Sequence, residues 1–420
     1  MKTKFIVMAA MAALFSMGFT ACSNNDDEMG GQIAQTRGDA IGFVPSAGFS
    51  HVTRGDATNS GNVTSQIASF QAWAYDATTN GIYMGAAATG VTVTYQSSAD
   101  ATLGNWVYAP VQFWPVNELN FLAVTPVAAP TGGALSHSTS AATGTATILT
   151  NYTAPTAVED QVDLMYACGH DATMDGETPA YVNGPVAKDD FAGDVPLQFK
   201  HALSQVVFQG KLTTDAVTKV VIEEITLGNI AKSVEGMSFT SAGSFFGGAD
   251  PAYANGTLGT ANVKFSLAGT QLEGKTWGLD ETKDGITAAQ KVTKNSAFDL
   301  TVSNSANDLH NAWFMIPQNQ TAWAGTGAQL KAGGLYSGSA NVDPASGSYL
   351  KIRAALYKDG VQILGSNESD AIYIPLAAQW ERGKKYIYTI EFNGTAALTP
   401  ITFSVAAENW TDAAQDPISM

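Results

Sequence analysis

The amino-acid sequence predicts an all-β fold. Short segments in which apolar and polar residues alternate recur along the chain, and each is bounded by Gly, Pro, Asn or Asp. Such alternation is typical of half-buried antiparallel strands, because successive side chains of a strand point to opposite faces. Charged residues make up only 14% of the chain, and 41 glycines favour frequent turns over long helices. Many short strands at this spacing predict antiparallel β-sandwiches.

The alternating segments define the predicted strands. Their apolar residues are, in chain order, Ile41 and Phe43; Val91, Val93 and Tyr95; Val206, Phe208 and Leu212; Ile352, Ala354 and Leu356; Tyr386, Tyr388, Ile390 and Phe392; and Ile401, Phe403 and Val405. Residues 215–225 and 281–291 have room for a short helical turn. The Gly- and Ser-rich residues 128–147 and 240–260 are expected to form long surface loops.

The N-terminus has the pattern of a lipoprotein signal peptide. Lys2 and Lys4 precede an apolar run over residues 5–19, and small residues then lead to Cys22. An apolar run this short behind a basic start is an export signal rather than a membrane-spanning helix. A cysteine at the junction supplies a thiol for diacylglycerol, and several acyl chains hold a protein durably on a bilayer. We therefore predict a signal peptide over residues 1–21 and a lipid on Cys22.

The rest of the chain divides into a tether and two domains. Residues 22–39 are acidic and rich in Gly, and they lack the apolar side chains needed to order themselves, so we predict a flexible tether. A Gly-, Pro- and Asp-containing stretch ends near residue 195. It suggests an N-terminal domain over residues 40–195 and a C-terminal domain over residues 196–420, both ordinary sizes for a domain.

Charge and cysteine content limit the function classes. The formal net charge of −16 argues against nucleic acid as a partner, because an acidic surface repels phosphate backbones. Besides Cys22 the only cysteine is Cys168, so the mature chain has no intramolecular disulfide. After the signal peptide no apolar run is long enough to span a bilayer as a helix.

The sequence lacks the usual patterns of catalytic and metal sites, so we predict no enzymatic activity, no cofactor and no metal. Cys168 and His170 form a Cys-x-His, but no third residue is placed to orient the histidine, so a buried thiol is expected. Neither a Gly-x-Ser-x-Gly elbow nor a phosphate-binding loop occurs. The histidines are scattered without metal-ligand spacing, at His51, His137, His170, His201 and His310.

The tryptophans have two interpretations. Five lie beside predicted strands and are expected in the core, namely Trp73, Trp106, Trp114, Trp380 and Trp410. Trp277, Trp313 and Trp323 lie in less regular surroundings. For these three, core packing and a sugar-binding platform both stay open.

Four patterns follow one another along the chain. They are Ala40-Ile41-Gly42-Phe43-Val44 behind Cys22; Phe70-Gln71-Ala72-Trp73-Ala74-Tyr75 with Trp106-Val107-Tyr108-Ala109-Pro110-Val111-Gln112-Phe113-Trp114-Pro115; Leu197-Gln198-Phe199-Lys200-His201-Ala202-Leu203-Ser204-Gln205-Val206; and Trp380-Glu381-Arg382-Gly383-Lys384-Lys385-Tyr386. In this order the chain resembles the fimbrillins, the pilins and pilus-associated lipoproteins of Bacteroidales. The acidic residues after Cys22 also resemble the surface-export signal of Bacteroidales lipoproteins, which implies an outer-membrane lipoprotein exposed on the cell surface.

The resemblance implies two transthyretin-like antiparallel β-sandwich domains in tandem and a subunit of a surface fimbria that supports adhesion. In polymerising fimbrillins an arginine-specific protease cuts after the first strand, and a strand of another subunit then fills the groove. Carried onto this chain, the cut is best placed at Arg54, with Arg37 as the alternative. The side chains that would leave with the first strand are Ile41, Phe43 and Ala47.

The role within a fimbria stays open. After Trp410 only residues 411–420 remain, and their few apolar side chains make a poor donor strand. Either residues 401–407 donate, or the subunit accepts a strand without donating one. Partners implied are other fimbrial subunits, the outer membrane, an arginine-specific protease, and a host or bacterial surface ligand. The alternative function is a non-polymerising surface lipoprotein that binds a glycan or a host protein.

Overall fold

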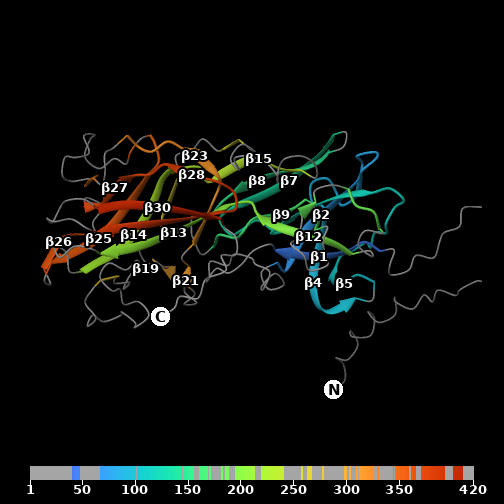
Figure 1. The fold of residues 1–420 in the computed structure, drawn as a ribbon, viewed down its shortest axis with the longest axis horizontal. Coiled ribbons are helices and arrows are strands. Elements are labelled where there is room, and N and C mark those ends of the chain that lie inside the picture. The colour runs from blue at the N-terminus through green and yellow to red at the C-terminus, as the bar shows by residue number, and fades with distance from the viewer. Residues whose placement is uncertain are drawn as a thin grey trace, which may run out of the picture. The chain divides into compact units, whose positions relative to one another are not determined.

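The computed structural model of the protein describes residues 40–47, 67–100, 102–142, 145–155, 160–168, 170–171, 181–182, 185–188, 194–212, 219–240, 257–258, 263–266, 277–278, 298–299, 302–303, 309–310, 312–324, 329–330, 344, 346–358, 361–365, 370–392 and 401–409. Every helix or strand named within these ranges is a β-strand (Figure 1), so the predicted all-β fold is confirmed. The described residues all belong to one compact unit, Thr36–Met420.

The first sheet contains the N-terminal strand at its edge. Its order is β1-β12-β9-β6-β2-β4-β5, with β3 beside β2. The strands are β1 (Gly42–Ala47), β2 (Ser69–Asp76), β3 (Ile82–Met84), β4 (Val91–Asp100), β5 (Gly104–Val107), β6 (Leu119–Thr125), β9 (Met165–Ala167) and β12 (Asp194–His201). Among the described residues β1 runs parallel to β12, and every other pair in this sheet is antiparallel.

The second sheet has the order β16-β15-β8-β7. Its strands are β7 (Ala134–Ala142), β8 (Thr145–Thr153), β15 (Ser233–Thr240) and β16 (Thr257–Leu258). The expectation of a long surface loop over residues 128–147 is therefore wrong. Exposed Ser136, Ser138 and Ser140 alternate with half-buried Leu135, His137 and Thr139, which is a strand pattern built from small polar residues.

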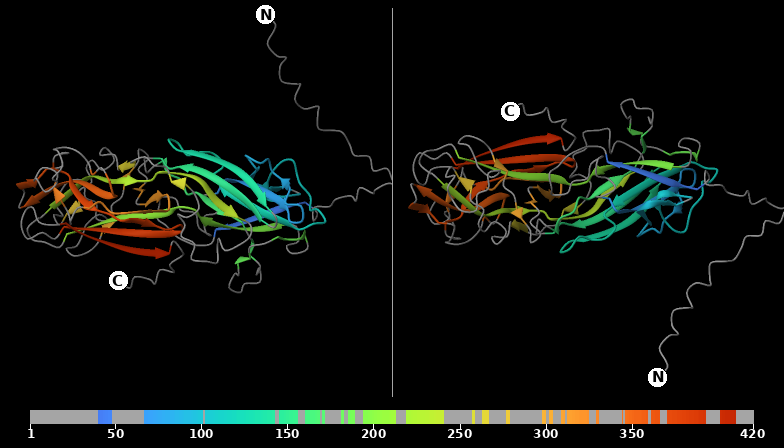
Figure 2. Two further views of the ribbon diagram at one scale, coloured as in Figure 1. Left: turned by 90° about the horizontal axis from the view of Figure 1, so that it is seen from above. Right: turned by 90° about the horizontal axis from the view of Figure 1, so that it is seen from below.

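The third sheet has the order β19-β13-β29-β30, with β22 beside β13. Its strands are β13 (Ser204–Leu212), β19 (Phe298–Asp299), β22 (Ala312–Met315), β29 (Lys384–Phe392) and β30 (Ile401–Asn409). β13 and β29 are parallel, and the last strand, β30, is antiparallel to β29. Both views of Figure 2 show β29 and β30 (red) side by side.

The fourth sheet has the order β17-β14-β25-β27-β24, with β18 beside β14 and β26 beside β25. Its strands are β14 (Lys219–Ile230), β17 (Val263–Ser266), β18 (Trp277–Gly278), β24 (Gln329–Leu330), β25 (Tyr349–Lys358), β26 (Val361–Leu364) and β27 (Ile372–Pro375). β14 overturns the helical turn expected at residues 215–225, because β-branched Val220, Val221 and Ile222 suit a strand paired with β25. Residues 281–291 lie outside the described residues.

Three short pairs complete the described strands. They are β10 (His170–Asp171) with β11 (Tyr181–Val182), β20 (Val302–Ser303) with β21 (Leu309–His310), and β23 (Gln318–Gln320) with β28 (Ala378–Trp380). Every pair is antiparallel.

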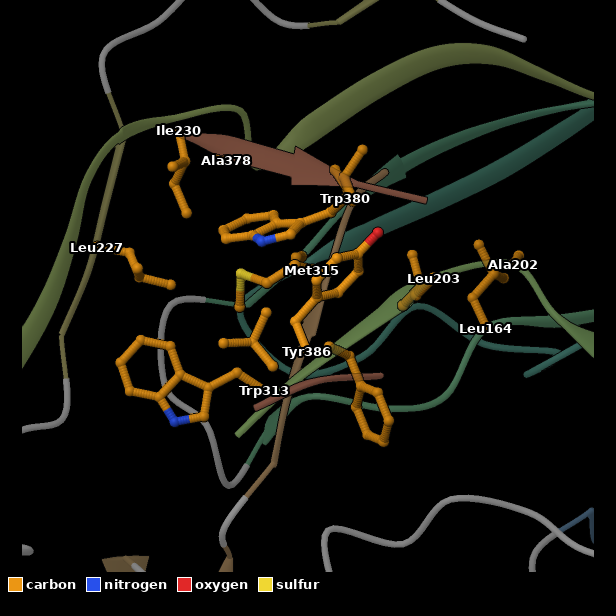
Figure 3. Close-up of a cluster of buried hydrophobic side chains, with 14 of the residues drawn as sticks. Leu164, Ala202, Leu203, Leu227, Ile230, Trp313, Met315, Ala378, Trp380 and Tyr386 are labelled. Carbon is orange, nitrogen blue, oxygen red and sulfur yellow. The ribbon is translucent and has the colours of Figure 1, made fainter. Parts of the chain in front are cut away.

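The central strands β2 and β6 of the first sheet are buried on both faces. On one face Phe43, Phe70, Phe121 and Phe199 contribute to a core that also includes Trp106. On the other face side chains of β2 and β6 pack in a second core with side chains of β8 and β15. This second core continues into the third and fourth sheets, and Figure 3 shows Trp313, Met315, Trp380 and Tyr386 gathered in part of it.

Strands from both sides of residue 195 share sheets. β12 pairs with β1 and β9 in the first sheet, and β8 pairs with β15 in the second. The buried Gln161 side chain also joins distant segments, because its Oε1 accepts from Phe314 N (2.8 Å) and its Nε2 donates to Pro155 O (3.1 Å). The division into domains over residues 40–195 and 196–420 stays a prediction.

Candidate functional site

The predicted strand exchange concerns β1 and the residues that it packs against. β1 pairs with β12 in parallel register from Gly42 opposite Asp194 to Ala47 opposite Phe199. About 150 residues separate the two strands, and among the described residues no other strand of the sheet pairs with β1. The rest of the first sheet therefore keeps all of its other strand pairings if β1 is taken away.

The inward side chains of β1 are core residues. Ile41, just before the strand, is 0% exposed and Phe43 is 2% exposed, whereas Val44, whose side chain is on the opposite face, is 45% exposed. The Phe43 ring lies among aromatic rings, with centroid distances of 5.8 Å to Phe70, 5.8 Å to Tyr108 and 5.9 Å to Phe121. The predicted burial of Ile41 and Phe43 is confirmed. For Ala47 the structure describes the backbone pairing and not the side chain.

Residues 108–113, which we call the strap, lie along the other edge of β1 at its start. Ile41 N donates to Gln112 O (2.9 Å), and the Tyr108 hydroxyl donates to Ile41 O (2.8 Å). The same hydroxyl accepts from Gln112 N at 3.2 Å. A bridge between Ala40 and Phe113 continues this contact. Burial raises the pKa of Tyr108 from its usual 10 to about 12, so the hydroxyl stays protonated even further above physiological pH than in an exposed tyrosine.

The hydrogen bonds described from the strap go to Ile41, at the beginning of the strand. N–H and C=O groups of alternate residues in a strand point to opposite edges. Since the main chain of Ile41 faces the strap, Phe43 and Pro45 face the same outer edge, and Gly42 and Val44 face β12. Pro45 has no N–H to offer at that edge, which is where proline is tolerated in a sheet. Among the described residues, the main-chain hydrogen bonds at the outer edge are therefore those of Ile41, at the start of the strand.

The predicted covalent sites lie elsewhere in the chain. Cys22, Arg37 and Arg54 are all outside the described residues. Lipidation at Cys22 and cleavage at either arginine therefore stay predictions.

The structure brings no catalytic or metal site together among the side chains it describes. In that part of the chain no group of three or more His, Cys, Asp or Glu residues is placed to hold a metal ion. Cys168 is buried, and burial raises the pKa of its thiol, which makes it a poor nucleophile. His201 is buried against Asp163, with Nδ1 2.8 Å from Oδ2. His51 and the side chains of His170 and His310 lie outside the described residues.

His137 on β7 is the one histidine with a resolved pKa shift in the described residues. Burial lowers its pKa from 6.5 to about 4. Its ring packs edge-on against Trp73 at 5.7 Å, and Nδ1 lies 2.9 Å from Thr150 Oγ1. Nε2 is buried and has no hydrogen-bond partner among the described residues, so a second ring proton would be poorly solvated there.

We predict that this histidine makes stability pH-dependent between about pH 6.5 and 4. In that window the unfolded state binds a proton that the folded state does not bind, so the free energy of unfolding falls as the pH falls. Chemical denaturation at pH 7, 5.5 and 4.5 measures this loss. The His137→Gln variant should lose less stability than the wild type over the same range, and parallel pH curves for the two proteins would refute the prediction.

Five of the tryptophans pack in the protein core. Trp73, Trp106, Trp114 and Trp380 are buried as expected, and so is Trp313, which ends its interpretation as a sugar platform. Trp323 is half-buried beside Tyr373, with ring centroids 6.5 Å apart. The Trp277 side chain and all of Trp410 lie outside the described residues.

Sequence reasoning missed the strap and the parallel pairing. The run from Trp106 to Pro115 stood out as a motif, but nothing in it indicates that the Tyr108 hydroxyl reaches Ile41, 67 residues earlier. The cis peptide bond between Ala109 and Pro110 lies within this run and a second joins Thr125 and Pro126, and the sequence indicates neither. The described part of the chain contains no helix of the length and apolarity needed to cross a membrane.

Comparison with known proteins gives one strong match. A model of a family described as fimbrillin-like matches residues 53–410. No curated protein matches the chain. Similar solved structures include a fimbrial protein from Bacteroides vulgatus ATCC 8482, with 16% identity, a TM-score of 0.49, and coverage of 89% of this chain and 100% of that one.

Two further structures are proposed cell adhesion proteins. The one from Bacteroides ovatus ATCC 8483 has 12% identity and a TM-score of 0.39, and the match covers 88% of this chain and 97% of that one. The one from Bacteroides eggerthii DSM 20697 has 12% identity and a TM-score of 0.36, with 89% and 97% covered. All three TM-scores are below 0.5, so the assignment of the chain to a family depends on the family model alone.

Proposed function

Because the chain belongs to the fimbrillin-like family, we propose that it is a structural or accessory subunit of a surface fimbria that supports adhesion. It acts at the cell surface through other pilus subunits and performs no catalysis. Before assembly, lipid on Cys22 holds it to the outer membrane. Assembly follows a cut at Arg54 by an arginine-specific protease, which lets β1 leave and a strand of another subunit enter.

The observation that carries this proposal is the way β1 is seated. It is an edge strand, parallel to its neighbour in an otherwise antiparallel described sheet, and its inward side chains are nearly fully buried. Removal of β1 would expose the aromatic walls around Phe43 and a row of unpaired main-chain groups on β12. Both favour refilling by another extended strand, because backbone hydrogen bonds give affinity and alternate pockets set the register.

The last strand of a second copy has a suitable pattern to enter. β30 begins Ile401-Thr402-Phe403, which repeats the Ile-x-Phe order of Ile41-Gly42-Phe43. As a donor it would have to leave its pairing with β29 along its whole length in its own subunit. A Cβ at position 42 would lie 1.8 Å from Asp194 Oδ1, so Thr402 in that place requires the exposed Asp194 carboxylate to turn away. Residues 411–420 are the other candidate donor and lie outside the described residues.

A peptide-binding experiment tests the proposal. A chain that begins at Gly55 should bind a labelled peptide of residues 40–47, because the groove is empty, whereas the full chain should not. Replacing both Ile41 and Phe43 of the peptide by aspartate should weaken binding at least about 100-fold, since charges would enter apolar pockets. Equal binding to both chains, or no difference between the two peptides, would count against strand exchange.

A further inference from the structure

The strap has no role in the exchange as proposed so far, yet it makes the most specific contacts with β1. Three hydrogen bonds join Ile41, Tyr108 and Gln112: Ile41 N donates to Gln112 O (2.9 Å), Tyr108 Oη donates to Ile41 O (2.8 Å) and Gln112 N donates to Tyr108 Oη (3.2 Å). Tyr108 is 6% exposed and its ring also contacts the Phe43 ring. One tyrosine therefore binds both the main chain and the central plug of the strand.

The strap is itself supported from outside. The Tyr83 hydroxyl, on β3, donates to Phe113 O at 2.5 Å. Phe113 in turn bridges to Ala40, so Tyr83 is connected to the start of β1 through the strap. Tyr83 thus fixes the end of the strap at Phe113, while Tyr108, at the beginning of the strap, binds Ile41.

We propose that the strap is the second wall of the strand-binding groove and acts as a latch on whichever strand occupies it. The strap contacts the occupant through the N–H and C=O of one residue, which every non-proline residue supplies. It can therefore close over β1 before exchange and over the donor strand afterwards. This inference rests on the proposed strand exchange, and it names Tyr108 as a residue that binds the exchanged strand.

The position of the latch gives strand release a direction. The latch holds Ala40 and Ile41, at the N-terminal end of β1, whereas Arg54 follows the C-terminal end. Towards that end Pro45 offers no N–H at the outer edge, and the contacts of β1 seen among the described residues there are its pairing with β12 and its buried side chains. Release therefore begins near Ala47, and the contacts with Tyr108 and Gln112 break last.

Hydrogen exchange on the full, uncut chain tests the latch without any need for cleavage or assembly. The Tyr108→Phe variant keeps the ring and loses the hydroxyl, which removes one partner from Ile41 O and one from Gln112 N. We expect amide exchange in residues 40–47 to become about tenfold faster. Amides of β6, which does not pair with β1 among the described residues, should keep their wild-type rates.

Two further variants separate the latch from other effects. Tyr83→Phe loosens the strap from outside, so it should speed exchange in residues 40–47 by about threefold. Tyr95→Phe is the matched control: its ring packs on Trp106, no bond from its hydroxyl to β1 is seen among the described residues, and rates in β1 should not change. Unchanged exchange in Tyr108→Phe, or equal acceleration in β1 and β6, would overturn the latch.

The same variants distinguish the latch from strand exchange itself. In the chain that begins at Gly55, Tyr108→Phe should speed dissociation of the peptide of residues 40–47 about tenfold. If the peptide binds and Tyr108→Phe leaves its dissociation unchanged, the latch fails and strand exchange stands. If no peptide binds although Tyr108→Phe speeds hydrogen exchange in the uncut chain, the latch stands as a clamp on β1 and strand exchange fails.

Discussion

Replacing Phe43 by alanine is expected to lower the free energy of unfolding by about 3–5 kcal/mol. The Phe43 ring is 2% exposed and touches three aromatic rings from β2, β6 and the strap, so its removal leaves a cavity with rigid walls. Unfolding in guanidinium, followed by tryptophan fluorescence, measures the change because Trp106 belongs to the same core.

Val44→Ala is the matched control for this prediction. Val44 is the next residue of the same strand and is 45% exposed, so its truncation should change the free energy of unfolding by no more than about 0.5 kcal/mol. Similar losses in the two variants would mean that β1 is not a plug with one buried face, and its proposed removal would then open no groove.

Replacing Arg54 by alanine is expected to abolish assembly into fimbriae, whereas Arg37→Ala should leave it intact. A cut after Arg54 separates β1 from the rest of the chain, because it falls between β1 and β2. A cut after Arg37 removes the tether only, and β1 stays covalently joined to the domain that it fills. The amount of sedimentable fimbriae on cells that express each variant measures the effect.

The two arginine variants can also fail in an informative way. If Arg37→Ala blocks assembly and Arg54→Ala does not, removal of the first strand is not the trigger. If neither variant affects assembly, an arginine cut is not needed, and the alternative of a non-polymerising lipoprotein that binds a glycan or host protein gains weight.

Much of the fold could be predicted from the alternation of apolar residues. Ile41 and Phe43 are buried on one face as expected, and the strands containing Val93, Ile352 and Ile390 occur where the pattern placed them. Alternation reports which face of a strand is buried. It fails where the side chains are small and polar, as in β7, because its serines led to the prediction of a loop.

Strand partners could not be predicted in the same way. β1 pairs with β12 about 150 residues later, and the motif from Leu197 to Val206 gives no sign that its first half completes the sheet of β1. Strand pairing over such a distance depends on the whole topology, because local sequence fixes only the period and the ends of a strand. The helical turn expected near residue 220 failed for a related reason, since pairing with β25 decides the conformation of β14.

The candidate site was predicted in part. The burial of Ile41 and Phe43 was predicted from their alternation, whereas their departure with an exchanged strand stays a proposal. The strap was not, because the bond between the Tyr108 hydroxyl and Ile41 O depends on how a turn after β5 folds back over the first strand. A conspicuous run of aromatic residues and prolines signalled that segment without indicating what it binds.

The most direct test is the mature N-terminus of the subunit in fimbriae purified from the native cell surface, read by mass spectrometry. We expect assembled subunits to begin at Gly55, with the lipid on Cys22 and the strand from Gly42 to Ala47 gone. Assembled subunits that begin at lipidated Cys22 and retain β1 would contradict strand exchange at this groove.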